Sequence, residues 1–323
     1  MRIGIVAPAS PVGQIELANG VARLRQHGLD VVVHPQTAQQ HFLFAGTDRQ
    51  RAQAFFDFAS DASIDAIWCA GGGYGATRIL PLLEEMTEDR RLPARKLLVG
   101  YSDITALHEF VRSRWNWASL HFPMPAAPSF TQIDAAHFDA AISYLHGRKP
   151  ADPWTTPALR FLYNPPAAPV SGVVVGGNLS LWAAMAGTPY APIPVPGRII
   201  FLEDVDEAPY RIDRMIVQLL QERTLLGASA IVLGDFTGCD DSPSSVMATA
   251  DDPSKRMPLR PTIPLDRALA ETFALVSEKL GIPIAVGLPV GHGPNFSPLP
   301  LGAEYELSPQ GVLSLTRWSW LQR

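Results

Sequence analysis

A serine stands where a buried strand is expected to turn into a helix. Residues 96–99 are mostly apolar, Gly100 and Ser102 follow, and a helical pattern begins at Asp103. Such a turn lifts a hydroxyl above the carboxyl edge of a parallel sheet and aims the next backbone N–H at the same point. The pattern therefore makes Ser102 a candidate nucleophile. Two observations favour a plain helix cap instead: serine is common at helix starts, and Ile104 stands where a hydrolase elbow has its second glycine.

A second strand-to-helix turn, residues 68–77, is rich in glycine. Backbone N–H groups at such a turn lie at the positive end of a helix, where an anion or an oxyanion can bind. Residues 71–76 also satisfy the dinucleotide pattern G-x-G-x-x-G/A. They follow the third expected strand, however, and no acidic residue ends the next one, which disfavours a nucleotide site. A tight turn without a ligand is the remaining interpretation.

A serine hydroxyl needs a neighbouring general base, and histidine is the usual one. Among the eight histidines of the chain, His292 lies in an irregular loop, residues 287–302, that is dense in glycine and proline. This loop directly follows an expected strand, and such loops often carry functional side chains as well as ordinary exposed ones. We therefore expect His292 to be the base. The other histidines considered lie in or at the ends of expected helices: His27, His108, His137 and His146.

Four carboxylates cluster where the apolar strand 198–203 ends. Glu203 directly terminates this strand and so has the best-fixed backbone, whereas Glu207 precedes Pro209 and could cap the next helix. We therefore expect Glu203 to orient the base. The cluster has a weak case as an oxygen-ligand site for Mg²⁺ or Ca²⁺, but no histidine or cysteine lies at ligand spacing around it. No metal site is predicted.

Composition restricts the class of partner. The chain has 323 residues, of which 47% are hydrophobic and 18% charged, and this is enough apolar content for a large core. A net charge of -5 disfavours nucleic acid and anionic membranes and favours a small substrate. The two cysteines suit a reducing compartment. The apolar start is too short for a signal peptide, and no segment reaches the length of a membrane-spanning helix. A cytoplasmic protein is expected.

The elements that must position these residues alternate along the first part of the chain. Strands are expected at residues 2–7, 31–33, 64–69 and 96–99, and helices at residues 14–27, 48–60, 76–86 and 103–114. This alternation predicts a parallel sheet covered by helices. Proline density rises at residues 123–130 and 149–169, which predicts an irregular connection and a domain boundary near residue 150.

A second domain is expected beyond that boundary. Its signals are strands at residues 172–175 and 198–203 and helices from residue 178 and over residues 210–222. Residues 239–264, rich in Asp, Ser and Pro, predict a long exposed loop. The predicted fold class is thus α/β. An N-terminal parallel-sheet domain (residues 1–150) carries the serine at its elbow, and an α/β or α+β domain (residues 151–323) carries the glutamate and the histidine.

Six ordered segments together resemble the LD-carboxypeptidase family, which includes muramoyltetrapeptide carboxypeptidases and microcin C self-immunity peptidases. These segments are residues 3–10, 72–75, 100–105, 176–180, 202–213, and 291–292 with 299–302. The resemblance spans nearly the whole chain. It implies that Ser102 attacks, His292 relays the proton and Glu203 holds the imidazole, in a site between two domains. It also implies an oxyanion hole made by the Asp103 backbone N–H and one glycine N–H of the turn at Gly72 and Gly73.

The family resemblance implies a serine carboxypeptidase that releases a terminal D-amino acid from a murein tetrapeptide by cleaving an L,D-amide, without metal or organic cofactor. A homodimer is a further expectation. Gly71 stands where the family usually has arginine, so substrate contacts at this turn are expected to differ. Two alternatives remain: a hydrolase of peptidyl or aminoacyl nucleotides of the microcin C type, and a non-catalytic protein that binds a nucleotide phosphate at the glycine turn.

Overall fold

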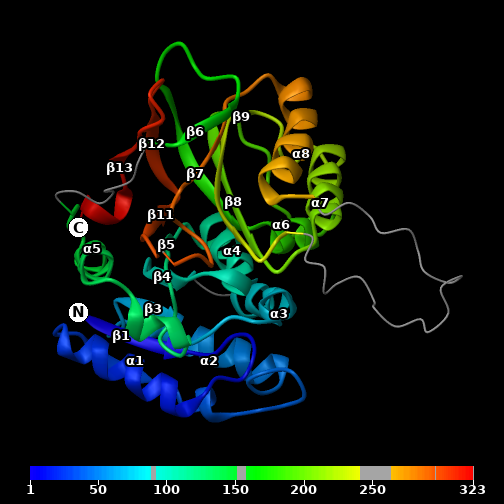
Figure 1. Ribbon diagram of the computed structural model, residues 1–323. Coiled ribbons are helices and arrows are strands. Elements are labelled where there is room, and N and C mark those ends of the chain that lie inside the picture. Colours follow the sequence, from blue (N-terminus) through cyan, green and yellow to red (C-terminus); the bar gives the residue numbers. More distant parts are fainter. Residues whose placement is uncertain (89–91, 151–157, 241–262, 295, 323) are drawn as a thin grey trace, which may run out of the picture.

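The computed structural model describes residues 1–88, 92–150, 158–240, 263–294 and 296–322. In these ranges the chain forms two sheets flanked by helices (Figure 1). The first sheet has the order β11-β5-β4-β3-β1-β2. Its strands are β1 (Arg2–Val6), β2 (Asp30–Val33), β3 (Ala66–Cys69), β4 (Leu97–Gly100), β5 (Ala118–His121) and β11 (Leu299–Leu301).

The first sheet is parallel except at one edge. Strands β1 to β5 pair in parallel, and β11 pairs with β5 in the antiparallel direction. Because β11 comes from residues 299–301, the chain returns to its first sheet between β10 and β12 of the second, which the sequence did not predict. The four residues of β3 and the four of β4 are all buried, as expected for parallel strands covered on both faces.

Helices cover the first sheet on both faces. They are α1 (Gln14–Gln26), α2 (Asp48–Ser60), α3 (Ala76–Glu88), α4 (Thr105–Trp115) and α5 (Ala135–Leu145). Alternate strand residues divide between two hydrophobic clusters: Leu98 packs with α2, α3 and α4, whereas Leu97 and Val99 pack with α1 and α5. Helix α2 begins with a capping box in which Thr47 and Gln50 bond to each other's backbone N–H. The expected α/β alternation is confirmed.

The second sheet has the order β13-β12-β7-β8-β9-β10-β6, with β7 to β10 parallel at its centre and antiparallel strands at both edges. Helices α7 and α8 lie on one side of this sheet, on the right in Figure 1. The strands are β6 (Arg160–Tyr163), β7 (Val170–Asn178), β8 (Arg198–Val205), β9 (Ala228–Thr237), β10 (Ile284–Val286), β12 (Ala303–Leu307) and β13 (Leu313–Arg317). The helices of this part are α6 (Leu179–Met185), α7 (Pro209–Gln221) and α8 (Leu265–Leu280).

Some boundaries differ from the sequence expectation. The helix expected from Asp103 starts at Thr105, because residues Ser102–Ile104 form a short 3-10 turn first. The described part of the stretch 149–169, expected to be irregular, contains the edge strand β6, which pairs with β10. Pro165, Pro166 and Pro169 follow this strand and so remove no hydrogen bond from its ladder. Most of the loop expected over residues 239–264 lies outside the described residues. Within the described ranges, no helix combines the length and apolarity needed to cross a bilayer.

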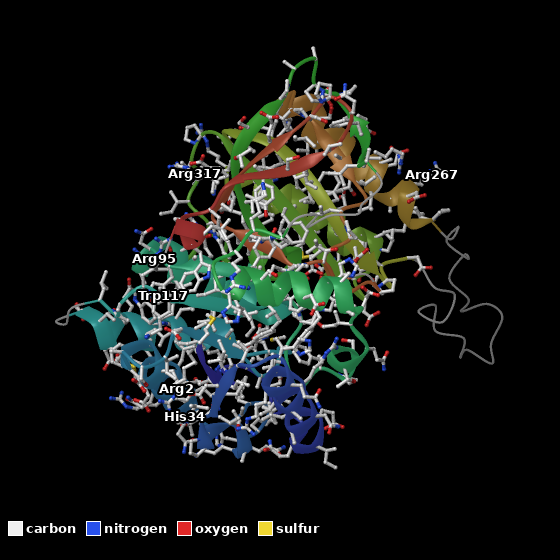
Figure 2. The ribbon with its side chains drawn as sticks, turned by 90° about the vertical axis from the view of Figure 1, so that its left-hand side faces the viewer. Arg2, His34, Arg95, Trp117, Arg267 and Arg317 are labelled. Atoms are coloured by element: carbon white, nitrogen blue, oxygen red, sulfur yellow. The ribbon has the colours of Figure 1, made fainter. Side chains whose placement is uncertain are left out.

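The two sheets meet through α4 and β7. The hydroxyl of Thr105, at the start of α4, accepts a hydrogen bond from the N–H of Asn178 at 3.0 Å. Gly177 allows this approach, since a Cβ there would lie 2.5 Å from the same hydroxyl. Figure 2 shows the two parts stacked, with Arg2 and His34 toward one end and Arg267 and Arg317 toward the other. The close contact places the end of β4 beside the centre of the second sheet.

Candidate active site

Ser102 occupies a strained position immediately after β4. Its φ is +61°, in the left-handed region that residues with a Cβ avoid. The residue at the N-cap of the short 3-10 turn is Tyr101, and no side chain caps this turn. Ser102 therefore does not serve as the helix cap that the sequence left open. A strained serine on a sharp strand-to-helix turn is the geometry that presents a hydroxyl for attack.

Asp103 ties the serine turn to the glycine turn. Its carboxylate is buried, and Oδ2 accepts a hydrogen bond from the backbone N–H of Ala76 at 2.7 Å. Burial raises the pKa of Asp103 to about 6, although the bond from Ala76 and the charge of Arg51 oppose the shift. The first turn of α3 and the turn after β4 are thereby held together.

The glycine turn lies directly against Ser102. A Cβ at Gly72 would be 3.2 Å from Ser102 Cβ and 3.3 Å from its Oγ. Gly73 has a φ of +99°, and Ser10 holds the turn from the other side. The N–H of Ser10 donates to the carbonyl of Gly72, and its hydroxyl accepts from the N–H of Tyr74. Ser10 belongs to the first family segment, residues 3–10, and the structure shows that it supports the glycine turn.

Glu203 and His292 form a hydrogen-bonded pair. His292 Nδ1 lies 2.7 Å from Glu203 Oε2, although 89 residues separate them along the chain. Glu203 is fully buried within β8, which continues to Val205, so it does not terminate the strand as the sequence suggested. Burial raises the pKa of Glu203, and the bond with His292 opposes that shift. A carboxylate on Nδ1 fixes the imidazole with Nε2 available to act as a base.

His292 is only partly buried and packs against the neighbour of Ser102. The rings of Tyr101 and His292 lie 4.7 Å apart between centroids. Burial lowers the pKa of His292, but the hydrogen bond and the charge of Glu203 outweigh burial and raise it overall. The histidine loop therefore reaches the end of β4. Ser102 and His292, both in described ranges, have no hydrogen bond to each other, and such bonds are often long before substrate binds.

Other residues singled out in the sequence have different surroundings. Glu207, the alternative acid, lies 3.4 Å from Arg211 at the start of α7. His108 is buried and bonds to the carbonyl of Gly100 at 2.9 Å. Sequence reasoning missed His121 and Asp235, which lie at or near the carboxyl ends of β5 and β9. Their position near the carboxyl ends of strands could have marked them as candidates, because open α/β sheets place ligands at the carboxyl ends of parallel strands.

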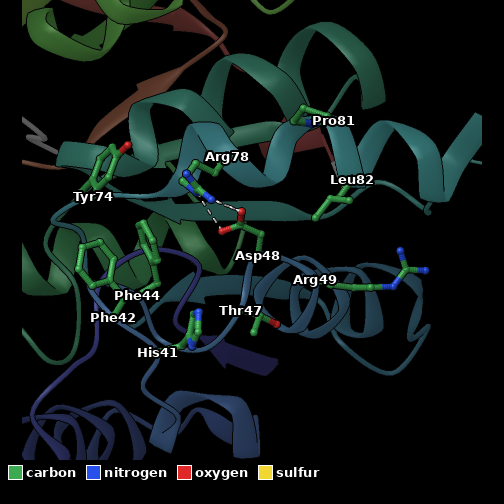
Figure 3. A pocket seen from close by; sticks show the side chains of 10 residues that line it. All are labelled: His41, Phe42, Phe44, Thr47, Asp48, Arg49, Tyr74, Arg78, Pro81 and Leu82. Atoms are coloured by element: carbon green, nitrogen blue, oxygen red, sulfur yellow. Dashed lines mark hydrogen bonds and ion pairs between the residues drawn. The ribbon is translucent and has the colours of Figure 1, made fainter.

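A hollow of about 840 Å³ opens beside the glycine turn (Figure 3). Tyr74, two residues after Gly72, lines it together with Phe44, and their ring centroids are 5.5 Å apart. Arg78 projects into the same hollow and donates three hydrogen bonds to the Asp48 carboxylate there. Across the described ranges, no group of three or more His, Cys, Asp or Glu side chains is arranged to hold a metal ion.

The fold and these residues define an α/β enzyme of the serine peptidase class. The chain belongs to the LD-carboxypeptidase family. Residues 3–122 match the LD-carboxypeptidase N-terminal domain, and residues 171–307 match the LD-carboxypeptidase C-terminal domain. The family resemblance drawn from the sequence is therefore confirmed.

Several relatives match this chain along nearly their whole length. A Streptomyces coelicolor protein named as a carboxypeptidase is 35% identical and matches 98% of this chain and 93% of its own. The murein tetrapeptide carboxypeptidase of Pseudomonas aeruginosa is 27% identical over 93% of this chain and 91% of its own. The crystal structure of muramoyltetrapeptide carboxypeptidase from Oxalobacter formigenes has a TM-score of 0.74 at 27% identity and covers 98% of both chains. A structure of MccF with glutamyl sulfamoyl guanosine, at 22% identity, has a TM-score of 0.76, covers 98% of this chain and 96% of its own, and shares the fold.

Proposed function

We propose that this chain is a serine carboxypeptidase that releases the terminal D-amino acid from murein tetrapeptides. Ser102 is the nucleophile, His292 the base and Glu203 the residue that orients it. The observation that carries the proposal is the 2.7 Å contact of His292 with the buried Glu203, on a loop that packs against the residue before Ser102. The names of the Pseudomonas and Oxalobacter relatives support the choice of substrate.

The proposed reaction has two halves. The Ser102 oxygen attacks the carbonyl carbon of the L,D-amide while its proton passes to Nε2 of His292, and Glu203 stabilises the imidazolium. The oxyanion faces the Asp103 N–H and an N–H of the Gly72-Gly73 turn. The C–N bond then breaks, His292 returns the proton to the leaving amine, and an acyl-enzyme remains. Water, deprotonated by His292, hydrolyses the ester and frees Ser102.

The proposed division of labour follows the chain. Residues 1–150 supply the nucleophile and both turns of the oxyanion hole, and residues 151–323 supply Glu203 and His292. Strand β11 (Leu299–Leu301), which pairs with β5 of the first sheet, begins seven residues after His292. The two parts are therefore joined by this sheet pairing and by the contact of α4 with β7.

The experiment that tests the proposal measures D-alanine release from a purified murein tetrapeptide. We expect Ser102→Ala to reduce turnover by at least about 10³-fold, because the acyl-enzyme can no longer form. A serine-directed fluorophosphonate should label the wild type at Ser102 and fail to label His292→Ala. Full turnover by Ser102→Ala contradicts the mechanism. Equal labelling of wild type and His292→Ala favours the passive nucleotide-binding alternative.

A second candidate function is hydrolysis of a peptidyl or aminoacyl nucleotide. The hollow beside the glycine turn favours it, since the half-exposed ring of Tyr74, which lines the hollow, offers a face on which a base can stack. The microcin C7 self-immunity protein MccF of Escherichia coli is 25% identical over 87% of this chain and 88% of its own. Parallel assays of murein tetrapeptide and a peptidyl sulfamoyl adenylate decide between the two. A strong preference for the adenylate contradicts the cell-wall substrate.

The remaining parts of the proposal concern setting and partners. The small peptide substrate, rather than nucleic acid or a membrane, is supported by the net charge of -5. A cytoplasmic role in peptidoglycan recycling is supported by two cysteines that are both free. We also propose a homodimer, on the family resemblance alone. Sedimentation of the purified protein at micromolar concentration tests this, and a monomer at that concentration contradicts it.

A further inference from the structure

Asp235 contacts the loop that carries His292 at two backbone positions. The Asp235 N–H donates to the carbonyl of Val290 at 2.9 Å, and its Oδ2 accepts from the N–H of Gly293 at 3.2 Å. These two loop residues flank His292 in the sequence. One residue near the carboxyl end of β9 thus holds the loop backbone on both sides of the imidazole.

Glycines make the contact between Asp235 and this loop unusually close. A Cβ at Gly293 would lie 2.2 Å from Asp235 Oδ2, and a Cβ at Gly291 would lie 2.9 Å from Glu203 Oε2 and 3.2 Å from Asp235 Cβ. Backbone therefore packs directly on both carboxylates, as glycine permits. Since no side chain intervenes, a change at Asp235 acts on the backbone that positions His292.

Among the described residues, the charged groups that act on Asp235 are Glu203 and His292, the hydrogen-bonded pair. Glu203 projects from β8 on one side, and His292 projects from the loop; β10, which pairs with β9 on its other side, consists of Ile, Ala and Val. Burial, together with the charge of Glu203, raises the pKa of Asp235 to about 6 against the opposing effects of Gly293 and His292. Above that pH, Asp235 adds negative charge beside the imidazole and favours its protonated form.

We propose that Asp235 is a positioning residue that fixes the His292 loop, so that the imidazole stays on Glu203 and faces Ser102. The proposal rests on the triad proposed above and extends it to a fourth side chain. Asp235 touches neither the substrate nor the reacting atoms in this role. It acts through the backbone of the loop and through its charge, and these two actions can be separated by substitution.

Two variants of the full chain separate the backbone contact of Asp235 from the effect of its charge. Asp235→Ala removes the acceptor for Gly293, whereas Asp235→Asn keeps an oxygen acceptor and removes the charge. We expect Asp235→Ala to lower both kcat on murein tetrapeptide and the rate of fluorophosphonate labelling at Ser102 by about 10- to 100-fold, with KM changed less than about threefold, because catalysis is sensitive to small misplacement. Asp235→Asn should lose much less of its kcat and labelling rate. The acid limb of its kcat/KM profile should move to lower pH, because the imidazolium of His292 loses a stabilising charge.

The matched control is Asp134→Ala. Asp134 also accepts a backbone N–H, that of Ala136 at the start of α5. This variant should keep kcat and the labelling rate within about twofold of the wild type, since the same kind of bond is lost away from the His292 loop.

Each outcome bears on a different part of the proposal. Equal labelling rates for Asp235→Ala and wild type, or an Asp235→Asn acid limb that coincides with the wild-type limb, overturn the role of Asp235 and leave the triad in place. If Asp235→Ala does not fold, the pH profile of Asp235→Asn decides. A wild type that labels at Ser102 without cleaving the tetrapeptide contradicts the substrate, and the labelling rates still test Asp235. A wild type that neither labels nor cleaves removes the triad, and the role of Asp235 falls with it.

Discussion

The imidazole Nε2 of His121 lies 3.9 Å from Oε1 of Glu203, and within the described ranges both buried atoms are without a hydrogen-bond partner. Burial, with the nearby histidines, holds the pKa of His121 well below its ordinary value, so this imidazole is neutral. A neutral neighbour supplies no charge to the carboxylate. The negative charge of the buried Glu203 carboxylate is therefore balanced by His292. This residue bonds the other carboxylate oxygen and becomes positive when it takes the serine proton.

Glu203→Gln should reduce kcat by about 10³- to 10⁴-fold, as loss of the orienting carboxylate does in other triads. The hydrogen bond and the charge of Glu203 are what raise the pKa of His292. Because an amide no longer favours the imidazolium, the residual activity should extend to lower pH than that of the wild type. A pH-rate profile measures both effects. Glu207→Gln, a change beside Arg211 on the surface, is the control, and a similar loss in both variants contradicts the assignment.

Replacing Ser102 should reveal the strain at its backbone. A left-handed residue with a Cβ costs about 1–2 kcal/mol relative to glycine, and Ser102 has a φ of +61°. Both Ser102→Ala and Ser102→Gly should be inactive, but the glycine variant should be more stable than the alanine variant by about 1 kcal/mol. Urea unfolding measures the difference. Equal stabilities would show that the turn holds no strain in solution.

Gly72→Ala should block the site while the protein still folds. The added methyl group would lie 3.1 Å from Met124 Cε and 3.3 Å from the Ser102 Oγ, in the space that an oxyanion must enter. We expect kcat/KM to fall by at least about tenfold, with stability changed by about 1 kcal/mol. Gly13→Ala is a suitable control, because its added methyl group meets only the flexible tip of Glu16. Equal activity of the two variants would place the oxyanion elsewhere.

Neither cysteine should react in the native protein. Cys69 and Cys239 are both free and buried. Burial raises the pKa of the Cys69 thiol far above its ordinary value and that of Cys239 to about 12, and the thiolate is the reactive form. Ellman's reagent at pH 8 should detect no thiol before denaturation and two after it. Rapid release of even one equivalent from native protein contradicts the burial of that residue.

Of the site proposed above, the sequence indicated the serine turn most directly. Ser102 could be found because an apolar strand, a glycine and a helical pattern flank it, and the 3.6- and 2-residue periods show where strand and helix meet. Its φ could not be predicted, since the residue type gives no sign of a left-handed conformation. Asp235 and His121 stayed hidden because their importance depends on strands that pair only in three dimensions. The return of β11 to the first sheet was hidden for the same reason, as three apolar residues in a proline-rich loop carry no strand signal of their own.

His108 should make the folded state sensitive to acid. It is buried and bonds to the carbonyl of Gly100, and burial lowers its pKa from 6.5 to about 4. Between these two pKa values, His108 is protonated in the unfolded chain and neutral in the folded chain. The free energy of unfolding therefore falls as pH drops from about 6.5 to about 4. This lowering of the His108 pKa corresponds to a loss of about 3 kcal/mol in the free energy of unfolding.

The comparison that isolates this effect uses His108→Gln, whose amide can donate to the same carbonyl but does not titrate. Between pH 7 and pH 4, the wild type should lose about 3 kcal/mol more of its unfolding free energy than this variant. Urea unfolding at steps of half a pH unit measures the loss, and His41→Gln, a change at an exposed histidine, should follow the wild type. Parallel losses in His108→Gln and wild type would mean that His108 takes up its proton equally in both states, and its burial beside Gly100 would then not hold in solution.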